Sequence, residues 1–206
     1  LKGSRTVLLG ENGCGKTTLL RLISRLEKPT RGVILQNIDD KFGQKSKQSK
    51  KWYKKVGVVY QNPDYQLFMQ TVEKEIKFGA KSDEYADEIA EKFGIKHLYA
   101  RHPQSLSEGQ KRRVSIAAVV ATDPEVLILD EPTVGQDYKG LCEMVEVLNK
   151  LHEEAHNTMI TVTHDKRCAA ALCDKSVWIK NGKTYKTGGK ELVDEFFIQI
   201  GVNKKF

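Results

Sequence analysis

The sequence predicts an α/β protein built on a mostly parallel β-sheet that helices cover on both faces. Apolar runs of strand length alternate with segments of helical periodicity, and this alternation is typical of parallel strands joined by crossover helices. A glycine-rich loop follows the first apolar run, and two carboxylates end a later one at residues 126–131. The pattern from residue 65 to about residue 121 is helical, which indicates a helical subdomain inserted into the core.

The glycine-rich loop at residues 10–18 matches the pattern G-x-x-x-x-G-K-[ST]. In this pattern glycines let backbone N–H groups converge on phosphates, a lysine brings charge to the outer phosphates, and a hydroxyl reaches Mg²⁺. The apolar run Val7–Leu9 precedes the loop and apolar residues follow it at helical spacing, so a helix N-terminus faces the anion. This context favours a phosphate-binding loop over a plain glycine-rich turn.

The chain of 206 residues is long enough for one nucleotide-binding unit. It has no apolar run of about 18 residues, the length a membrane-spanning helix needs, and no secretory signal at its start. We therefore expect a protein that is soluble by itself. The four cysteines form no C-x-x-C pair, which favours a reducing, cytosolic setting.

The formal charge of +7 comes from one lysine-rich segment. Seven lysines and no acid lie between Lys41 and Lys55, which leaves 27 basic and 27 acidic residues in the rest of the chain. We interpret residues 41–51 as a solvated surface hairpin, with anionic lipid or nucleic acid as less favoured partners.

Several strands end at polar residues. Residues 55–60 predict a buried strand that Pro63 ends, because proline cannot extend a central ladder, so Gln61 lies at a strand end. Residues 158–163 predict another strand, which His164 follows. Further predictions are a strand at residues 32–35, a long helix at residues 111–121 and a hairpin at residues 177–186 with an Asn-Gly turn.

Asp130 and Glu131 end the apolar strand that begins at residue 125. A carboxylate in that position can hold Mg²⁺ while its neighbour polarises an attacking water. Two exposed acids at a strand end are common in α/β proteins, but the phosphate-binding loop upstream favours the functional interpretation.

The order of these motifs resembles that of an ABC ATPase over nearly the whole chain. The corresponding segments are residues 10–18 for Walker A, Gln61 for the Q-loop, residues 105–110 for the signature, residues 126–131 for Walker B, residues 132–137 for the D-loop and His164 for the H-loop. A phosphate-binding loop followed by an L-S-x-G-Q signature is far more specific than either alone. The resemblance implies a P-loop core at residues 1–61 and 123–206, with the helical subdomain at residues 62–122.

The resemblance also implies roles within one chain, with ATP and Mg²⁺ as cofactors. The nucleotide-binding residues would be Asn12, Gly13, Cys14, Gly15, Lys16, Thr17 and Thr18. Thr17, Gln61 and Asp130 would hold Mg²⁺ through oxygen or water ligands. Glu131 would be the general base for the attacking water, and His164 would contact the γ-phosphate and orient that water, with Gln61 also counted as catalytic.

A second subunit is implied as well. Ser107, Gly109 and Gln110 of the signature would reach ATP held by the opposite subunit through a helix N-terminus, and Asp137 would belong to the D-loop. Hydrolysis would then need a dimer, either of two copies of this chain or of this chain and a related one.

Two features depart from the family pattern. Glu108 replaces the usual second glycine of the signature, and we expect its carboxylate to point away from the nucleotide. The aromatic residue that stacks on adenine lies upstream of the loop in such ATPases, and only nine residues precede Gly10 here. The N-terminal β-subdomain is therefore expected to be incomplete.

Residues 152–156 match H-E-x-x-H, the zinc metalloprotease pattern. They lie at the polar end of a predicted surface helix, and the sequence offers no third ligand. We expect no zinc chemistry there.

The region from Gln61 to Gly79 resembles the Q-loop region of energy-coupling factor and cobalt-type importer ATPases. That resemblance implies an ATPase bound to integral membrane subunits at the cytoplasmic face of the membrane, where it powers uptake of a vitamin or a transition-metal ion. The alternative is a soluble ABC ATPase that acts on nucleic acid or the ribosome, although nucleic acid is the less expected partner. A small-molecule kinase would have no use for the signature.

Overall fold

The computed structural model describes residues 3–32, 34 and 52–201. Within these residues a six-stranded sheet has the order β2-β3-β4-β1-β5-β6. The strands are β1 (Arg5–Leu9), β2 (Val56–Val59), β3 (Val126–Asp130), β4 (Thr158–Val162), β5 (Lys175–Lys180) and β6 (Lys183–Gly188). All neighbouring pairs are parallel except the β5–β6 hairpin. The prediction of a mostly parallel sheet is confirmed, whereas the predicted strand at residues 32–35 and the lysine-rich segment lie largely or wholly outside the described residues.

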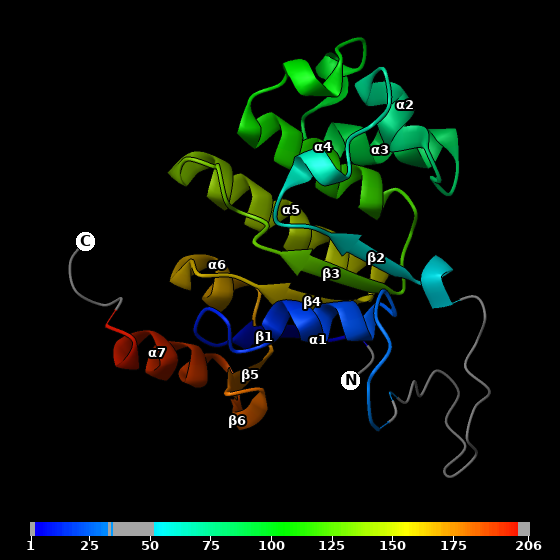
Figure 1. Ribbon diagram of the computed structural model, residues 1–206. Coiled ribbons are helices and arrows are strands. Elements are labelled where there is room, and N and C mark those ends of the chain that lie inside the picture. Colours follow the sequence, from blue (N-terminus) through cyan, green and yellow to red (C-terminus); the bar gives the residue numbers. More distant parts are fainter. Residues whose placement is uncertain (1–2, 33, 35–51, 202–206) are drawn as a thin grey trace.

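Helices cover both faces of the sheet (Figure 1). They are α1 (Lys16–Ile23), α2 (Val72–Lys77), α3 (Asp83–Lys92), α4 (Glu108–Val120), α5 (Tyr138–Ala155), α6 (Lys166–Ala171) and α7 (Lys190–Gln199). On one face α1 packs Leu20 against Leu8, Ile128 and Val162. The opposite face packs against α5, α6 and α7 through two further apolar clusters. This two-sided burial explains why the central strands are apolar along their whole length.

The helices α2, α3 and α4 form the upper part of the molecule in Figure 1. The last of them begins at Glu108, three residues before the predicted start at Lys111, because Ser107 caps it. Its other end packs against β2, where a Cβ at position 57 would lie 2.5 Å from Val119 Cγ1. Gly57 therefore lets the sheet and the helical part approach closely. The division at residues 62 and 122 stays a prediction.

The predicted hairpin is confirmed by β5 and β6, which pair antiparallel. Its turn residues Asn181 and Gly182 both have positive φ, 51° and 72°, as a two-residue turn between twisted strands requires. The turn also contacts the glycine-rich loop, since the Gly182 N–H donates to the Cys14 carbonyl at 3.1 Å. A Cβ at Gly10 would lie 2.6 Å from the Ile179 carbonyl oxygen. The hairpin thus braces the loop from outside.

Among the helices of the described residues, none combines the length and the apolar character that crossing a membrane would require.

Gly57→Ala should lower the free energy of unfolding by about 1–3 kcal/mol, because the new methyl group overpacks the contact between β2 and α4. Urea unfolding followed by circular dichroism measures the change. Val119→Ala removes the crowding group, so the double variant should recover part of the loss. Equal stability of Gly57→Ala and the parent would show that the close approach is not required.

Candidate functional site

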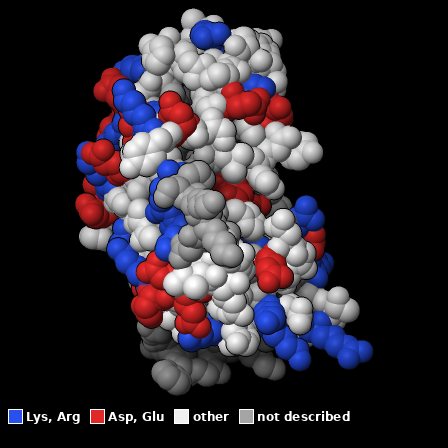
Figure 2. Space-filling view, turned by 90° about the vertical axis from the view of Figure 1, so that its left-hand side faces the viewer, with Lys and Arg blue, Asp and Glu red and all other residues white. Residues whose placement is uncertain are grey.

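The parallel strands β1, β2, β3 and β4 end at one edge of the sheet, on the left of Figure 1. Residues 10–18 follow β1, Gln61 follows β2, Asp130 and Glu131 come at the end of β3, and His164 follows β4. Figure 2 looks onto this edge and shows acidic side chains in a recess across the middle of the described surface. The fold thus brings the predicted residues of four segments to the same edge of the sheet, at the carboxyl ends of its parallel strands.

The loop at residues 10–18 has a backbone that depends on glycine. Gly13 and Gly15 have φ of 78° and 105°, which favour glycine. Gly15 is the N-cap of α1, and among the described residues no side chain caps this helix. The first N–H groups of a helix without such a cap can bind an anion.

Lys16 is almost buried, with 8% of its surface exposed. Its ammonium donates to the carbonyls of Gly10 at 2.7 Å and Glu11 at 2.9 Å. These contacts fold the side chain back over its own loop, so the positive charge lies where phosphates would meet the loop amides.

The three predicted Mg²⁺ ligands line one hollow of about 310 Å³. Thr17 comes from the start of α1, Gln61 from the end of β2 and Asp130 from the end of β3. A hydroxyl, an amide oxygen and a carboxylate are the hard oxygen donors that Mg²⁺ takes. Burial raises the pKa of Asp130, and the charges of Arg112 and Lys16 oppose that rise. The residues present therefore fit a divalent cation beside phosphates.

Glu131 and His164 lie side by side. The Glu131 Oε2 atom accepts a hydrogen bond from the His164 backbone N–H at 3.2 Å, and its Oε1 atom lies 3.6 Å from His164 Nε2. Oε1 is buried and finds no hydrogen-bond partner among the described residues. Burial raises the pKa of this carboxyl. An oriented carboxylate oxygen with a raised pKa is suited to accept a proton from a water.

Glu131 also has a strained backbone, with φ of +53°. Left-handed backbone costs about 1–3 kcal/mol for a residue other than glycine and clusters at functional sites. The residue is only 5% exposed. The strained backbone and the buried carboxylate of Glu131 therefore both lower the stability of the fold at this position.

The signature residues form the N-terminus of α4. Ser107 Oγ accepts from the Gln110 N–H at 3.3 Å, and Gln110 Oε1 accepts from the Ser107 N–H at 3.1 Å, which is a capping box. Gln110 is thus engaged within its own helix. Figure 1 shows α4 in the upper part of the molecule and the loop between β1 and α1 in the lower part. The structure does not bring Ser107 and Gly109 to the phosphate-binding loop of the same chain.

Glu108 is exposed, and its carboxylate lies 3.4 Å from Lys111 Nζ. The same ammonium pairs with Asp64 at 2.9 Å. The acid that replaces a glycine in the signature is therefore partly neutralised within its own helix turn.

Two residues that the sequence did not single out tie these segments together. Gln136 Nε2 donates to the Gly109 carbonyl at 2.8 Å, so the loop before α5 holds the signature. Asp137, predicted as a D-loop residue, caps α5 by accepting from the Gly140 N–H at 2.7 Å.

Arg112 of α4, the second of these two residues, is 2% exposed and donates to the carbonyls of Tyr60 and Gln61. Its burial had no sequence signal, because Lys111 and Arg113 flank it.

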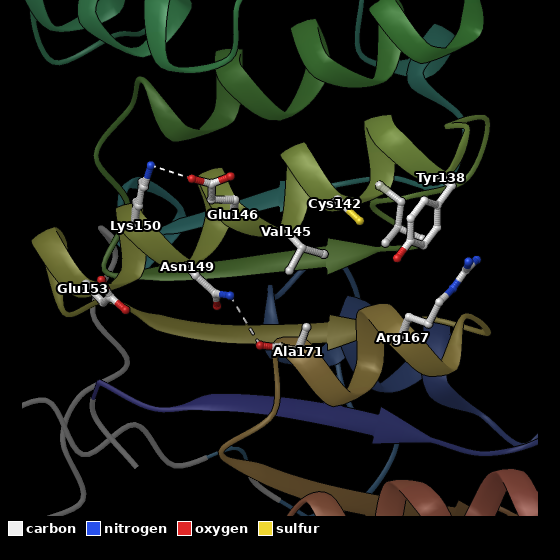
Figure 3. A pocket seen from close by; sticks show the side chains of 10 residues that line it. Tyr138, Cys142, Val145, Glu146, Asn149, Lys150, Glu153, Arg167 and Ala171 are labelled. Atoms are coloured by element: carbon white, nitrogen blue, oxygen red, sulfur yellow. Dashed lines mark hydrogen bonds and ion pairs between the residues drawn. The ribbon is translucent and has the colours of Figure 1, made fainter.

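A separate hollow of about 540 Å³ lies between α5 and α6 (Figure 3). Its lining includes Tyr138, Cys142 and Val145 of α5 and Arg167 and Ala171 of α6. None of the predicted site residues lines it.

The H-E-x-x-H segment ends α5. His152 is 8% exposed, whereas His156 is exposed and takes the left-handed C-cap position. Within the part of the chain that the structure describes, no group of three His, Cys, Asp or Glu residues could hold a metal ion.

Comparisons with known proteins identify the family of this chain. The sequence profile of the family described as "ABC transporter" matches residues 1–134. The energy-coupling factor transporter ATP-binding protein EcfA2 of Enterococcus faecalis is 42% identical over 207 aligned positions, which cover 93% of this chain and 70% of that protein. EcfA2 of Bacillus subtilis is 41% identical, with 91% and 71% covered.

Solved structures show the same fold. CbiO1 of Clostridium perfringens, described as part of the ABC transporter complex cbiONQ, superposes with a TM-score of 0.78 at 32% identity and covers 98% of this chain and 85% of its own. The ATP-binding cassette MJ0796, a dimer in a post-hydrolysis state bound to ADP and Pi, gives 0.79 at 25% identity, with 92% and 87% covered. This chain therefore belongs to the ABC transporter family and carries its ATPase domain.

Proposed function

We propose that this chain is the ATP-binding and ATP-hydrolysing subunit of an ABC importer of the energy-coupling factor type, which takes up a vitamin or a transition-metal ion. One observation carries the catalytic part. Thr17, Gln61 and Asp130 line one hollow, and at the same edge of the sheet Glu131 presents a carboxylate oxygen that has no hydrogen-bond partner among the described residues. The likeness to EcfA2 proteins and to CbiO1 supports the transport part.

The chain's own residues would divide the work of phosphoryl transfer. The amides of residues 13–18 and Lys16 bind the β- and γ-phosphates, and Thr17, Gln61 and Asp130 hold the cation. Bound Mg²⁺ supplies neutralisation of the phosphate charge. Glu131 accepts the proton of the attacking water, and His164 orients that water against the γ-phosphate. Each step is positioning or charge stabilisation, which is what this reaction requires.

A second ATPase subunit would complete the site. Ser107 and Gly109 lie away from the phosphate-binding loop of their own chain, so their helix N-terminus is available to ATP held by a partner. The dimer of MJ0796 with ADP and Pi supports such an arrangement. ATP binding would then close the dimer and hydrolysis would release it.

A groove of about 730 Å³ between β2, α2 and α4 would receive helices of integral membrane subunits at the cytoplasmic face of the membrane. The rings of Phe68 and Phe78, 67% and 58% exposed, meet edge to face at 5.3 Å along it. Exposed aromatic pairs in a groove are typical of protein interfaces.

Glu131→Gln should lower ATP turnover by about 10² or more, because an amide cannot accept the water proton. ATP binding should persist, so size-exclusion chromatography with ATP should show a long-lived dimer. Glu146→Gln, an exposed change on α5, is the control. Undiminished hydrolysis in Glu131→Gln would remove Glu131 from its role.

Glu108→Gly should change ATP turnover by less than about twofold, because Lys111 already compensates this exposed carboxylate. Glu108→Gln removes the charge without a glycine at the helix start and is measured beside it. A large gain in both variants would show that the carboxylate opposes the partner's γ-phosphate.

Phe68→Asp should weaken co-purification with polytopic membrane subunits while ATP binding stays intact, because it places a charge in the aromatic groove. Ile198→Asp, at another exposed apolar position on α7, is the control. Salt-sensitive binding to RNA or DNA, with no membrane partner recovered even for the parent chain, would contradict the importer proposal and favour the soluble alternative.

A further inference from the structure

Arg112 is the largest side chain that the described core buries completely, at 2% exposure. Removing a guanidinium from water is costly, and burial lowers its pKa. Among the described residues its Nε atom has no hydrogen-bond partner, and its two other nitrogens are the ones that donate. The Nη1 atom donates to the Tyr60 carbonyl at 2.6 Å, and Nη2 donates to the Gln61 carbonyl. The planar guanidinium thus donates hydrogen bonds to two successive backbone carbonyls.

Those carbonyls belong to the chain just beyond β2, where pairing with β3 ends at Val59. They have no partner in the sheet, and the Arg112 guanidinium supplies their hydrogen-bond donors. Gln66 holds the same segment, since its side chain accepts from the Tyr60 N–H and donates to the Val58 carbonyl. Arg112 and Gln66 together therefore hold the backbone that leads into Gln61.

The charge of Arg112 also reaches the two carboxylates of β3. Asp130 and Glu131 are the acids that most oppose the lowering of the Arg112 pKa, and Glu108 follows them. Direct hydrogen bonds of Arg112, however, go to the Tyr60 and Gln61 carbonyls and not to these acids. The hydrogen bonds of Arg112 therefore affect the position of Gln61 more directly than the positions of Asp130 and Glu131.

We propose that Arg112 is a positioning residue that locks the backbone of Gln61 to helix α4. The lock keeps the Gln61 side chain at the hollow it shares with Thr17 and Asp130, and it makes Gln61 follow any movement of the signature helix. A planar, two-pronged donor does this better than an ammonium, because both carbonyls are held at a fixed angle. The catalytic consequence rests on the proposed function, but the structural lock does not.

The first test is hydrogen–deuterium exchange of the protein without nucleotide. Arg112→Met should speed exchange in a peptide covering residues 60–66 and leave the peptide of residues 10–18 unchanged. Arg113→Met is the matched control, since Arg113 pairs with Glu143 at 2.6 Å. Arg112→Lys should give an intermediate rate. Unchanged exchange at residues 60–66 in Arg112→Met would overturn the lock, whatever the enzyme does.

The second test is a double-mutant cycle on ATP turnover. Arg112→Met should lower kcat about tenfold or more, as misplacement by a fraction of an ångström can, with the KM for ATP within about twofold. In a Gln61→Ala background the same change should have little further effect. Equal losses in both backgrounds would overturn positioning through Gln61. Absence of turnover in the parent chain would instead count against the proposed function, and the exchange result would still decide the lock.

If Arg112→Met unfolds at a clearly lower temperature, Arg112→Gln replaces it, because a shorter amide keeps one donor without a charge. Partial rescue by Arg112→Lys over Arg112→Gln would then support the lock. Failure of lysine to exceed glutamine in both exchange and kcat would refute it.

Discussion

The parallel register of β1, β3 and β4 is the constraint on which the site depends. Asp130 pairs with Val162, and the ladder continues one step further because the Glu131 N–H donates to the Val162 carbonyl at 2.8 Å. This step places the Glu131 side chain beside the backbone of His164. A shift of one residue would send each side chain to the opposite face of the sheet. The contact between Glu131 and His164 thus depends on the pairing of the strands as well as on the two residues.

The site concentrates groups that are costly to keep. Glu131 has a left-handed backbone and a buried carboxylate, and Lys16 and Arg112 are cations with 8% and 2% of their surfaces exposed. Each cation donates to two backbone carbonyls, of Gly10 and Glu11 in one case and of Tyr60 and Gln61 in the other. Backbone carbonyls stabilise a cation without neutralising it, so the positive charge remains available to phosphates and carboxylates nearby.

Much of this architecture could be predicted from the sequence, because the informative signals are local. Apolar runs that alternate with helical segments indicate parallel strands. Proline at position 63 indicates where β2 ends, and Asn181 with Gly182 indicates the hairpin turn. The contact of that turn with Cys14 could not be predicted, because it joins residues far apart in the chain through backbone atoms. The apolar periodicity predicts the start of α4 at Lys111, three residues late, because this periodicity begins only after the cap.

The burial of Arg112 escaped prediction for a related reason. Three consecutive basic residues suggest a solvated face, yet Lys111 pairs with Asp64, Arg113 pairs with Glu143, and Arg112 is buried against the chain that follows β2. The carbonyls of Tyr60 and Gln61 lack a partner in the sheet because β2 has ended, and the donors of Arg112 reach them only because α4 packs against β2.

Gln136 and Arg112 together connect the signature to both neighbouring segments of its own chain. Gln136 holds the Gly109 carbonyl from the loop after β3, while Arg112, one helix turn later, holds the carbonyls after β2. In the proposed dimer, Ser107 and Gly109 serve the nucleotide of the partner, whereas Gln61 and Glu131 serve the nucleotide of their own chain. In that proposed arrangement, a displacement of α4 by a nucleotide in one site would reach Gln61 of the other site through Arg112 and would also reach Gln136, in the loop that follows Glu131. Because these hydrogen bonds join α4 directly to both segments, such coupling needs no large rearrangement, only rigid movement of α4 with the segments it holds.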